Sequence, residues 1–207
     1  MAALVNVLKS SVTKVSTPVR CLSFAVGNIP AKTQNLIGNK FLDSSAEKWI
    51  DVHNPATNEV VTQVPCSTMD EMNAAVASAK EAYKTWSKTS VMARQGVMFK
   101  YHLKDIVGLI TIEQGKTLPD AEGDVIRGLQ VVGHCCSMTN LLLGETLPGI
   151  TKDMDLKSYR VPIKVCAGIA PFNFPAMIPL WLFPMATICG NTYIMKPSER
   201  TPEHVWP

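Results

Sequence analysis

Acidic residues are missing from the start of this 207-residue chain, in which Asp43 is the first. The same segment is rich in Ser and Thr and carries Lys9, Lys14, Arg20, Lys32 and Lys40. Its apolar residues recur at spacings of three and four, as expected on one face of a helix: Leu4, Leu8, Val12, Val15, Val19 and Leu22. This composition is typical of a mitochondrial transit peptide, which we predict over residues 1–34. The alternative is a basic terminus without a targeting role.

Several other patterns are absent, and each absence excludes a class of site or protein. The six cysteines form no C-x-x-C pair, so zinc-ligand spacing is missing and we expect no metal site. Neither G-x-G-x-x-G nor a Walker lysine motif occurs. No basic run is interleaved with aromatic residues, which argues against nucleic acid. The longest apolar stretch, 176–190, contains two prolines and is shorter than the ~20 residues that span a bilayer, so we expect no membrane partner.

The overall composition suits a folded globular chain. Hydrophobic residues make up 46%, charged residues 18%, and the net charge is +3. We interpret the cysteines as small buried thiols in a reducing compartment. Residues 35–207 are long enough to bury a substantial core and form a second region after the leader.

Short strands and then helices are predicted along this second region. Strands are expected at Leu36–Leu42, Trp49–His53 and Val60–Val64, with turns at Gly38-Asn39 and at 55–58. A capping box formed by Thr68 and Glu71 predicts a helix whose apolar face carries Met72, Val76, Ala79, Tyr83 and Trp86. Further helices are expected over Val91–Glu113 and from Pro119 to Leu143, ending at Gly144, followed by an extended segment from Leu156 to Pro162.

The segment from Val165 to Lys196 carries the strongest functional signal. It predicts a strand at Val165–Ile169 buried on both faces, a turn bracketed by Pro171 and Pro175, a helix ending at Gly190, and a strand at Tyr193–Met195. This is half of a nucleotide-binding βαβ layer, and open α/β sheets bind ligands at the carboxyl ends of such strands. We expect both strands to have unpaired edges.

Polar residues follow each of these strands. Asn173 lies in the turn, where it is either a turn-forming residue or a catalytic amide. Lys196 and Glu199 could bind sugar hydroxyls, or they could form a solvated ion pair. The residues alone leave both alternatives open.

Two segments, Ala170-Pro-Phe-Asn-Phe-Pro175 and Met195-Lys-Pro-Ser-Glu199, resemble signatures of the aldehyde dehydrogenase superfamily. Four more segments are similar to its mitochondrial, CoA-acylating branch, which oxidises methylmalonate and malonate semialdehydes in valine and pyrimidine breakdown: His53–Asn58, Glu113–Lys116, Ala121–Leu129 and Val165–Ala170. The resemblance covers roughly Leu36 to Pro202. It implies an α/β fold with a partial parallel nucleotide-binding sheet, flanking helices and a small β-rich oligomerisation region.

The resemblance also implies roles for individual residues. Asn173 matches the oxyanion-hole amide, and Arg127 matches an arginine that holds the substrate carboxylate through two parallel bonds. Five positions match contacts to NAD: Ala170, Phe172, Lys196, Glu199 and Arg200. For Arg127 the alternative is an i,i+3 ion pair with Asp124. The resemblance implies that a small semialdehyde is the substrate and that coenzyme A is the acyl acceptor. It also implies a homo-oligomer, as a tetramer, located in the mitochondrial matrix.

The chain also departs from this family. No cysteine lies in the motif of the family nucleophile, and the general-base glutamate is expected downstream of Pro207. We therefore expect this polypeptide to be inactive alone. The alternative is a non-catalytic truncated or pseudogene-like form that binds at most nucleotide or another subunit. Three positions carry unusual residues: Gly96 and Gly133 lie in helical segments, and Lys164 replaces a usual glycine. The region between Arg94 and Lys116 is shorter than in the family.

Overall fold

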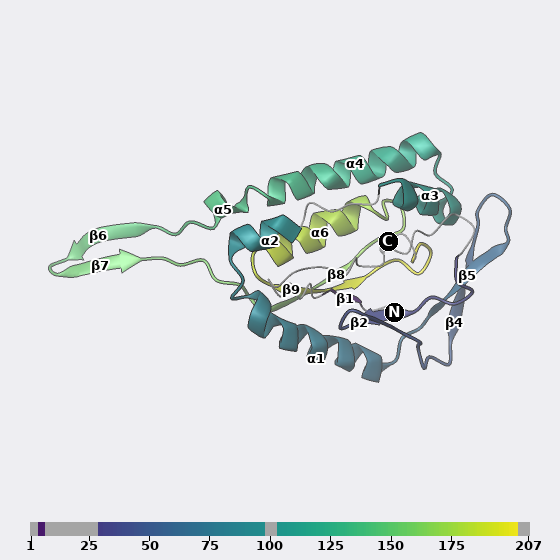
Figure 1. Cartoon of the computed structure of the whole chain (residues 1–207), viewed down its shortest axis with the longest axis horizontal. Helices are drawn as coiled ribbons and strands as arrows, with labels where there is room; N and C mark the ends of the chain where they lie inside the picture. The colour runs from purple at the N-terminus through teal and green to yellow at the C-terminus, as the bar shows by residue number, and fades with distance from the viewer. Residues whose placement is uncertain (1–3, 7–28, 98–102, 203–207) are drawn as a thin grey trace, which may run out of the picture.

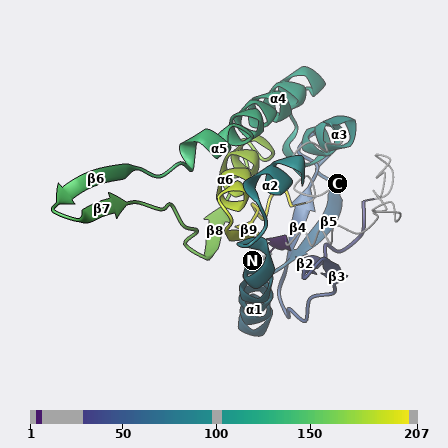
Figure 2. The ribbon, with the colours of Figure 1, turned by 60° about the vertical axis from the view of Figure 1, so that its left-hand side comes forward.

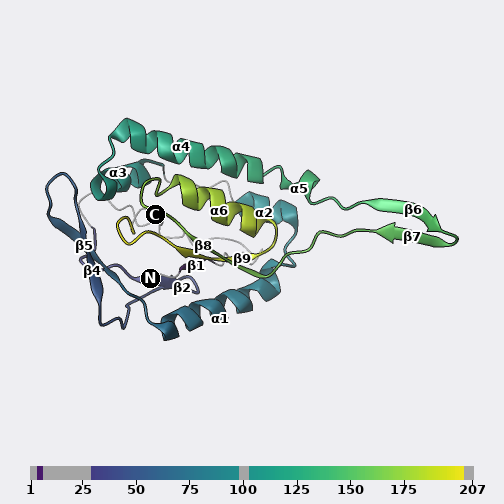
Figure 3. The same ribbon diagram turned by 180° about the vertical axis from the view of Figure 1, so that it is seen from behind.

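The computed structural model describes residues 4–6, 29–97 and 103–202 of the chain. Its centre is a sheet in the order β1 (Leu4–Asn6), β9 (Thr192–Lys196), β8 (Val165–Ile169). Helix α1 (Met69–Trp86) covers one face, and α6 (Met177–Ile188) covers the other with α4 (Leu118–Cys135) packed outside it, as Figures 1 and 3 show. The α/β architecture with a partial parallel sheet is confirmed.

The parallel pair β8 and β9 lies where the sequence predicts it. Ala167 is opposite Ile194 and Gly168 opposite Met195 in the ladder. Strand β9 is buried, but β8 is only partly covered, and Ile169 at its end is 76% exposed. The expectation that Val165–Ile169 is buried on both faces was wrong, because α1 and α6 pack mainly on β9 and cover β8, the edge strand in the described part of the chain, less completely.

Strand β1 changes two expectations. It pairs antiparallel with β9, with Leu4 opposite Met195, so β9 is not left with an open edge. Leu4 therefore lies in a strand and not in the expected helical stripe, because an unpaired strand edge offers ladder hydrogen bonds to any extended segment. The other stripe residues, from Leu8 to Leu22, lie outside the described residues.

Helix α1 begins at the predicted capping box. The Thr68 hydroxyl accepts the Glu71 N–H, and the Glu71 carboxylate accepts the Thr68 N–H. The buried face is lined by Ala75, Ala79, Ala82 and Trp86, so two members of the expected stripe are central and the rest lie at its border. The Trp86 indole N–H also donates to the Thr187 carbonyl at 2.9 Å, which ties α1 to the end of α6.

The strands and turns predicted between residues 36 and 64 are present, and they pair as two hairpins. Strands β2 (Asn35–Ile37) and β3 (Lys40–Leu42) are joined by Gly38 and Asn39, whose φ angles of 60° and 64° suit a tight hairpin turn. Strands β4 (Trp49–His53) and β5 (Val60–Pro65) pair antiparallel across the 55–58 turn. These hairpins depend on local turn chemistry, which a sequence displays directly.

The helix expected from Pro119 to Leu143 is interrupted. The helix expected over Val91–Glu113 is described as α2 (Val91–Val97) and α3 (Leu103–Gln114), and residues 98–102 between them lie outside the described residues. Helix α4 ends at Cys135, and a short α5 (Met138–Leu141) follows. At this break the Ser137 hydroxyl donates to the His134 carbonyl, a local bond that competes with the helical ladder.

A long hairpin leaves the body between α5 and β8. Its strands β6 (Thr146–Thr151) and β7 (Met154–Lys157) project away from the layers in Figures 1 and 2. Every residue of both strands is exposed. The sequence predicted only an extended segment at Leu156–Pro162, and the pairing of β6 with β7 was not predicted. Within the described ranges, no helix is long and apolar enough to cross a membrane.

Lys164 sits immediately before β8 with a φ of 97°, in the left-handed region that favours glycine. Its backbone is fixed from both sides: its N–H donates to Asn191 Oδ1 at 3.0 Å, and its carbonyl accepts the Thr192 N–H at 2.9 Å. The unusual lysine therefore occupies a strained position at the start of the parallel pair.

Candidate functional site

The two signature segments meet at the carboxyl ends of β8 and β9. The Ala170 N–H donates to the Lys196 carbonyl at 2.9 Å, extending the parallel ladder by one bond. Beyond it, the Arg200 guanidinium lies over the Phe172 ring at 4.9 Å from the ring centroid. The structure thus brings together the five residues that the resemblance assigns to a nucleotide: Ala170, Phe172, Lys196, Glu199 and Arg200.

Lys196 and Glu199 form an ion pair, with 3.1 Å between Nζ and the carboxylate. The pKa of Glu199 is lowered by the hydrogen bond from its own backbone N–H, then by the Lys196 ammonium, with a further contribution from Arg200. The side chains are 23% and 48% exposed, so the pair is accessible from solvent. This geometry is that of a solvated ion pair, one of the two alternatives that the residues left open. Because the pair is accessible, each side chain can also exchange its partner for a ligand hydroxyl.

Asn173 is exposed in the turn between β8 and α6. The residues after it are progressively covered, with Phe174 half-buried and Pro175 buried. Its carboxamide is therefore presented on a turn that is anchored on both sides: by Ala170 to β9, and by the first turn of α6 to α4. An amide held this way can donate to a developing oxyanion.

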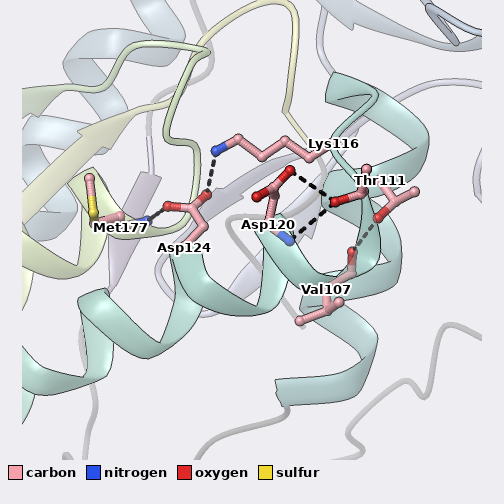
Figure 4. A network of polar contacts seen from close by, with 7 residues as sticks. Val107, Thr111, Lys116, Asp120, Asp124 and Met177 are labelled. Carbon is pink, nitrogen blue, oxygen red and sulfur yellow. Dashed lines mark hydrogen bonds and ion pairs between the residues drawn. The ribbon is translucent and has the colours of Figure 1, made fainter.

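The contact between this turn and α4 depends on a buried ion pair. Lys116 Nζ lies 3.4 Å from Asp124 Oδ2, and Asp124 is completely buried. The other carboxylate oxygen, Oδ1, accepts the Met177 N–H at 3.2 Å, as Figure 4 shows. The same lysine lies over the Phe174 ring, 4.3 Å from its centroid.

No role at the site was predicted for Lys116 or Phe174, and at the site Asp124 was considered only as an alternative partner for Arg127. The signal available was weak, because Lys116 and Asp124 are single charged residues on either side of a helix start, and acidic residues are ordinary there. Their convergence on the Asn173 turn is a tertiary feature, since Lys116 and Met177 are distant in sequence.

Arg127 lies on α4 and its residue is exposed. Among the described residues no ion pair joins it to Asp124, so that alternative was wrong: Asp124 points to Lys116 and α6 instead. The next residue, Gly128, faces Leu180 so closely that a Cβ there would meet Leu180 Cδ1 at 2.5 Å. In the described part of the chain, Arg127 makes no hydrogen bond or ion pair with the signature turn, so its substrate role stays a prediction.

The cysteines of the described region are free thiols. Burial raises the pKa of Cys135 to about 11, with smaller contributions from Cys136 and Cys189. Burial also raises the pKa of Cys166 and of Cys189. A thiol must ionise to be nucleophilic, so these three are unsuited to covalent catalysis at neutral pH. In the same region, no group of three or more His, Cys, Asp and Glu side chains could hold a metal ion.

A nucleotide fits the chemistry of this edge. The accessible Lys196 and Glu199 provide a donor and an acceptor for sugar hydroxyls at the end of a parallel strand. Phe172 is 44% exposed and offers an apolar ring beside them. These groups form one side of a binding site rather than an enclosed pocket.

Comparisons with known proteins agree with this geometry. A mouse mitochondrial acylating methylmalonate-semialdehyde/malonate-semialdehyde dehydrogenase is 58% identical over 206 residues, covering 94% of this chain and 38% of that protein. The human counterpart is 65% identical over 172 residues, covering 80% of this chain and 32% of its own length. The chain therefore spans less than two fifths of the curated relatives that it matches.

Solved structures show the same fold. A methylmalonate-semialdehyde dehydrogenase from Oceanimonas doudoroffii superimposes with a TM-score of 0.82 at 36% identity, covering 86% of this chain and 37% of that one. A Sinorhizobium meliloti structure assigned to the same enzyme, complexed with NAD, gives 0.81 at 36% identity, covering 84% of this chain and 36% of that one. The sequence profile of the aldehyde dehydrogenase family matches residues 41–206. This chain belongs to the aldehyde dehydrogenase family.

Proposed function

We propose that this chain supplies the oxyanion amide and part of the cofactor site of an NAD-dependent, CoA-acylating methylmalonate/malonate-semialdehyde dehydrogenase. The observation that carries the proposal is the bond from the Ala170 N–H to the Lys196 carbonyl. Because this bond joins the ends of β8 and β9, the Asn173 turn and the Lys196–Glu199 pair open onto the same edge of the sheet. A catalytic amide and a nucleotide site must be neighbours if hydride is to leave the substrate carbon.

On this proposal, Lys196 and Glu199 bind the ribose hydroxyls on the adenosine side of NAD, and Arg200 lies on the same side. Ala170 and Phe172 also contact the cofactor. Bound NAD supplies the hydride acceptor for aldehyde oxidation. Arg200 is already held over the Phe172 ring, so less side-chain entropy is lost when both contact a ligand.

Asn173 donates its side-chain N–H to the aldehyde oxygen when a thiolate attacks the carbonyl carbon. Negative charge grows on that oxygen as the carbonyl becomes tetrahedral, so the bond strengthens in the transition state. Removing one such donor costs about 3 kcal/mol in comparable acyl-transfer sites. The anchored turn presents the amide without further rearrangement, which is the condition for this kind of stabilisation.

We assign the substrate carboxylate to Arg127 and the acyl acceptor to coenzyme A. Both assignments rest on the resemblance and on the name "acylating" carried by the relatives. The exposed guanidinium of Arg127 has no ion-pair partner among the described residues, so it is free to bind a carboxylate.

We propose that the attacking thiolate is not one of the described cysteines. Burial raises the pKa of Cys135, Cys166 and Cys189, and neither Cys66 nor Cys136 lies in the motif of the family nucleophile. The isolated 207-residue polypeptide should then produce no NADH from semialdehyde and CoA. A non-catalytic role, binding nucleotide or a longer subunit, is the second candidate, and its support is the raised pKa of the Cys135, Cys166 and Cys189 thiols. NADH production lost on cysteine alkylation would contradict both proposals.

Residues 1–34 are proposed to direct the chain to the mitochondrial matrix, in line with relatives named as mitochondrial. We propose homo-oligomer formation, as a tetramer, through the β6–β7 arm. Its support is the set of exposed apolar side chains on the arm, namely Leu147, Ile150, Met154 and Leu156. A reporter fused to residues 1–35 that stays cytosolic would contradict the targeting proposal.

The test of the cofactor site is a titration of the 15N-labelled 207-residue chain with NAD, followed by amide chemical shifts. We expect weak, saturable shifts at Ala170 and Lys196, with a Kd of about 1 mM or weaker because only one side of a site is present. Lys196→Met and Glu199→Ala should each abolish saturation.

Lys84→Met is the matched control, because Lys84 forms an exposed ion pair with Glu81 on α1 and lies away from the sheet edge. Shifts scattered over the surface, or unchanged in Lys196→Met, would mean that this edge does not bind the nucleotide.

A further inference from the structure

Lys116 occupies a fixed place between two helices. It follows the end of α3, where the Gly115 N–H donates to the Thr111 carbonyl at 3.0 Å. It precedes Thr117, the N-cap of α4, whose hydroxyl accepts the Asp120 N–H at 3.3 Å and donates to the Asp120 carboxylate at 2.9 Å. The short loop is therefore held at both ends, and the lysine side chain is directed from a defined backbone position, as Figure 4 shows.

The ammonium of Lys116 lies between a carboxylate and an aromatic ring. Its side chain is 15% exposed, and the Asp124 side chain is fully buried. In such surroundings a charge pair is retained only if its remaining hydrogen-bonding capacity is used. Here the second carboxylate oxygen accepts the Met177 N–H, and the lysine contacts the Phe174 ring face.

These contacts converge on both ends of one short segment, from Phe174 to Met177. Phe174 directly follows Asn173, and Met177 begins α6. The pair thus holds the C-terminal side of the turn, while the Ala170 N–H to Lys196 carbonyl bond holds the N-terminal side. With both sides held, the Asn173 backbone has little freedom to move its carboxamide.

We propose that Lys116 and Asp124 are positioning residues for the Asn173 carboxamide, acting through the Phe174 ring and the first turn of α6. The inference rests on the proposed oxyanion role of Asn173. It predicts that substitutions at Lys116 and Asp124 alter the order of the Asn173 side-chain amide, although neither residue contacts that amide.

The test uses the whole 207-residue chain labelled with 15N and follows the Asn173 side-chain amide, identified by its disappearance in Asn173→Ala. The main variant is Lys116→Met combined with Asp124→Asn. It removes both charges, so no lone buried charge remains, and the Asn oxygen can still accept the Met177 N–H. We expect the Asn173 resonance to move toward free-amide shifts and to broaden, with the melting temperature recorded separately.

The matched control is Lys84→Met combined with Glu81→Gln, the same chemical change at a pair whose side chains are 68% and 69% exposed. It should leave the Asn173 signal unchanged. Lys116→Arg keeps a cation between the carboxylate and the ring, and it should preserve the wild-type signal. A purely structural role would change the melting temperature and leave the Asn173 amide at its wild-type position.

If the main variant does not fold, Phe174→Leu carries the test, because it removes the ring and leaves the buried pair intact. An Asn173 resonance unchanged in a folded main variant, or in folded Phe174→Leu, overturns the proposal. The NAD titration separates this outcome from failure of the proposed function. Loss of NAD binding with an ordered Asn173 amide contradicts the proposed function and leaves the positioning proposal intact. A displaced amide with normal NAD shifts supports the positioning role of Lys116 and Asp124 independently.

Discussion

The β8–α6–β9 layer and the β6–β7 arm are both regular, hydrogen-bonded structure, but they are stabilised differently. In the layer, Ile188 and Met195 are nearly inaccessible, and α4 closes over α6 at Gly128. In the arm, every residue of both strands is exposed, and the pairing of Thr146 with Lys157 and Leu147 with Leu156 is its main internal contact. Burial therefore concentrates stability in the layer that presents the site and leaves the arm dependent on local bonds.

The sharpest test of this contrast is a large-to-small substitution in each region. Ile188→Ala should lower the free energy of unfolding by about 2–5 kcal/mol, because it leaves a cavity beneath the sheet. Leu156→Ala, at a side chain that is 55% exposed, should change it by about 0.5 kcal/mol or less. Urea unfolding followed by circular dichroism measures both, and equal losses would remove the distinction between layer and arm.

Two glycines on α4 test how far the close packing of the layer extends. A Cβ at Gly128 would meet Leu180 Cδ1 at 2.5 Å, so Gly128→Ala should destabilise by about 1 kcal/mol even after its gain in helix propensity. Gly133 has no atom within 4 Å of such a Cβ, so Gly133→Ala should stabilise by about 1 kcal/mol. Melting temperatures that move in the same direction would show that α4 does not pack as closely as described.

Strained backbone occurs in both regions and should matter more in the layer. Lys164, with φ of 97°, starts β8, and Lys164→Gly should raise stability by about 1 kcal/mol. Asp153, with φ of 63°, lies in the turn of the arm, where an aspartate tolerates the left-handed region better than a lysine. Asp153→Gly should therefore give a smaller change in the same unfolding assay, and the reverse order would contradict this account.

The smallest expected effect is electrostatic and is confined to the site. The pKa of Glu199 lies below its ordinary value of 4.5, chiefly through its own backbone N–H and Lys196. A lowered pKa in the folded chain means that the ionised form stabilises the fold above the ordinary value, and this contribution is lost as pH falls through the folded pKa. In Lys196→Met, the Glu199 carboxyl should titrate at higher pH by NMR. An unchanged midpoint would show that the ion pair is not formed in solution.

Local patterns predicted the elements that local chemistry controls. Three such features were predicted correctly, because each depends on neighbouring residues. They are strands β4 and β5, the turn at Gly38 and Asn39, and the capping box of Thr68 and Glu71. The β8–turn–α6–β9 order and the clustering of Lys196 and Glu199 followed from apolar runs and breakers. The resemblance then assigned roles that the residues alone left open.

Other features could not be predicted from the sequence. Neither face of the β6–β7 hairpin is buried, so burial imposes no alternation of apolar and polar residues from which the two strands could be predicted. At the end of α4, the Cys136 N–H and the Ser137 hydroxyl donate to carbonyls of the last helical turn. Gly144, which we expected to end the helix, instead lies where a Cβ would meet the Ser158 carbonyl oxygen. Such close approaches involve residues distant along the chain.

The sequence by itself determined the order of strands, turns and helices and the residues that line the sheet edge, because propensity and periodicity act over a few residues. The tertiary structure decided which charges became buried partners. Asp124 had Arg127 one helical turn away, yet it pairs with Lys116 and binds the start of α6, because packing of α4 on α6 excludes water around it. In this low-dielectric contact, an ion pair with Asp124 is favourable only if the other oxygen of its carboxylate is also hydrogen-bonded.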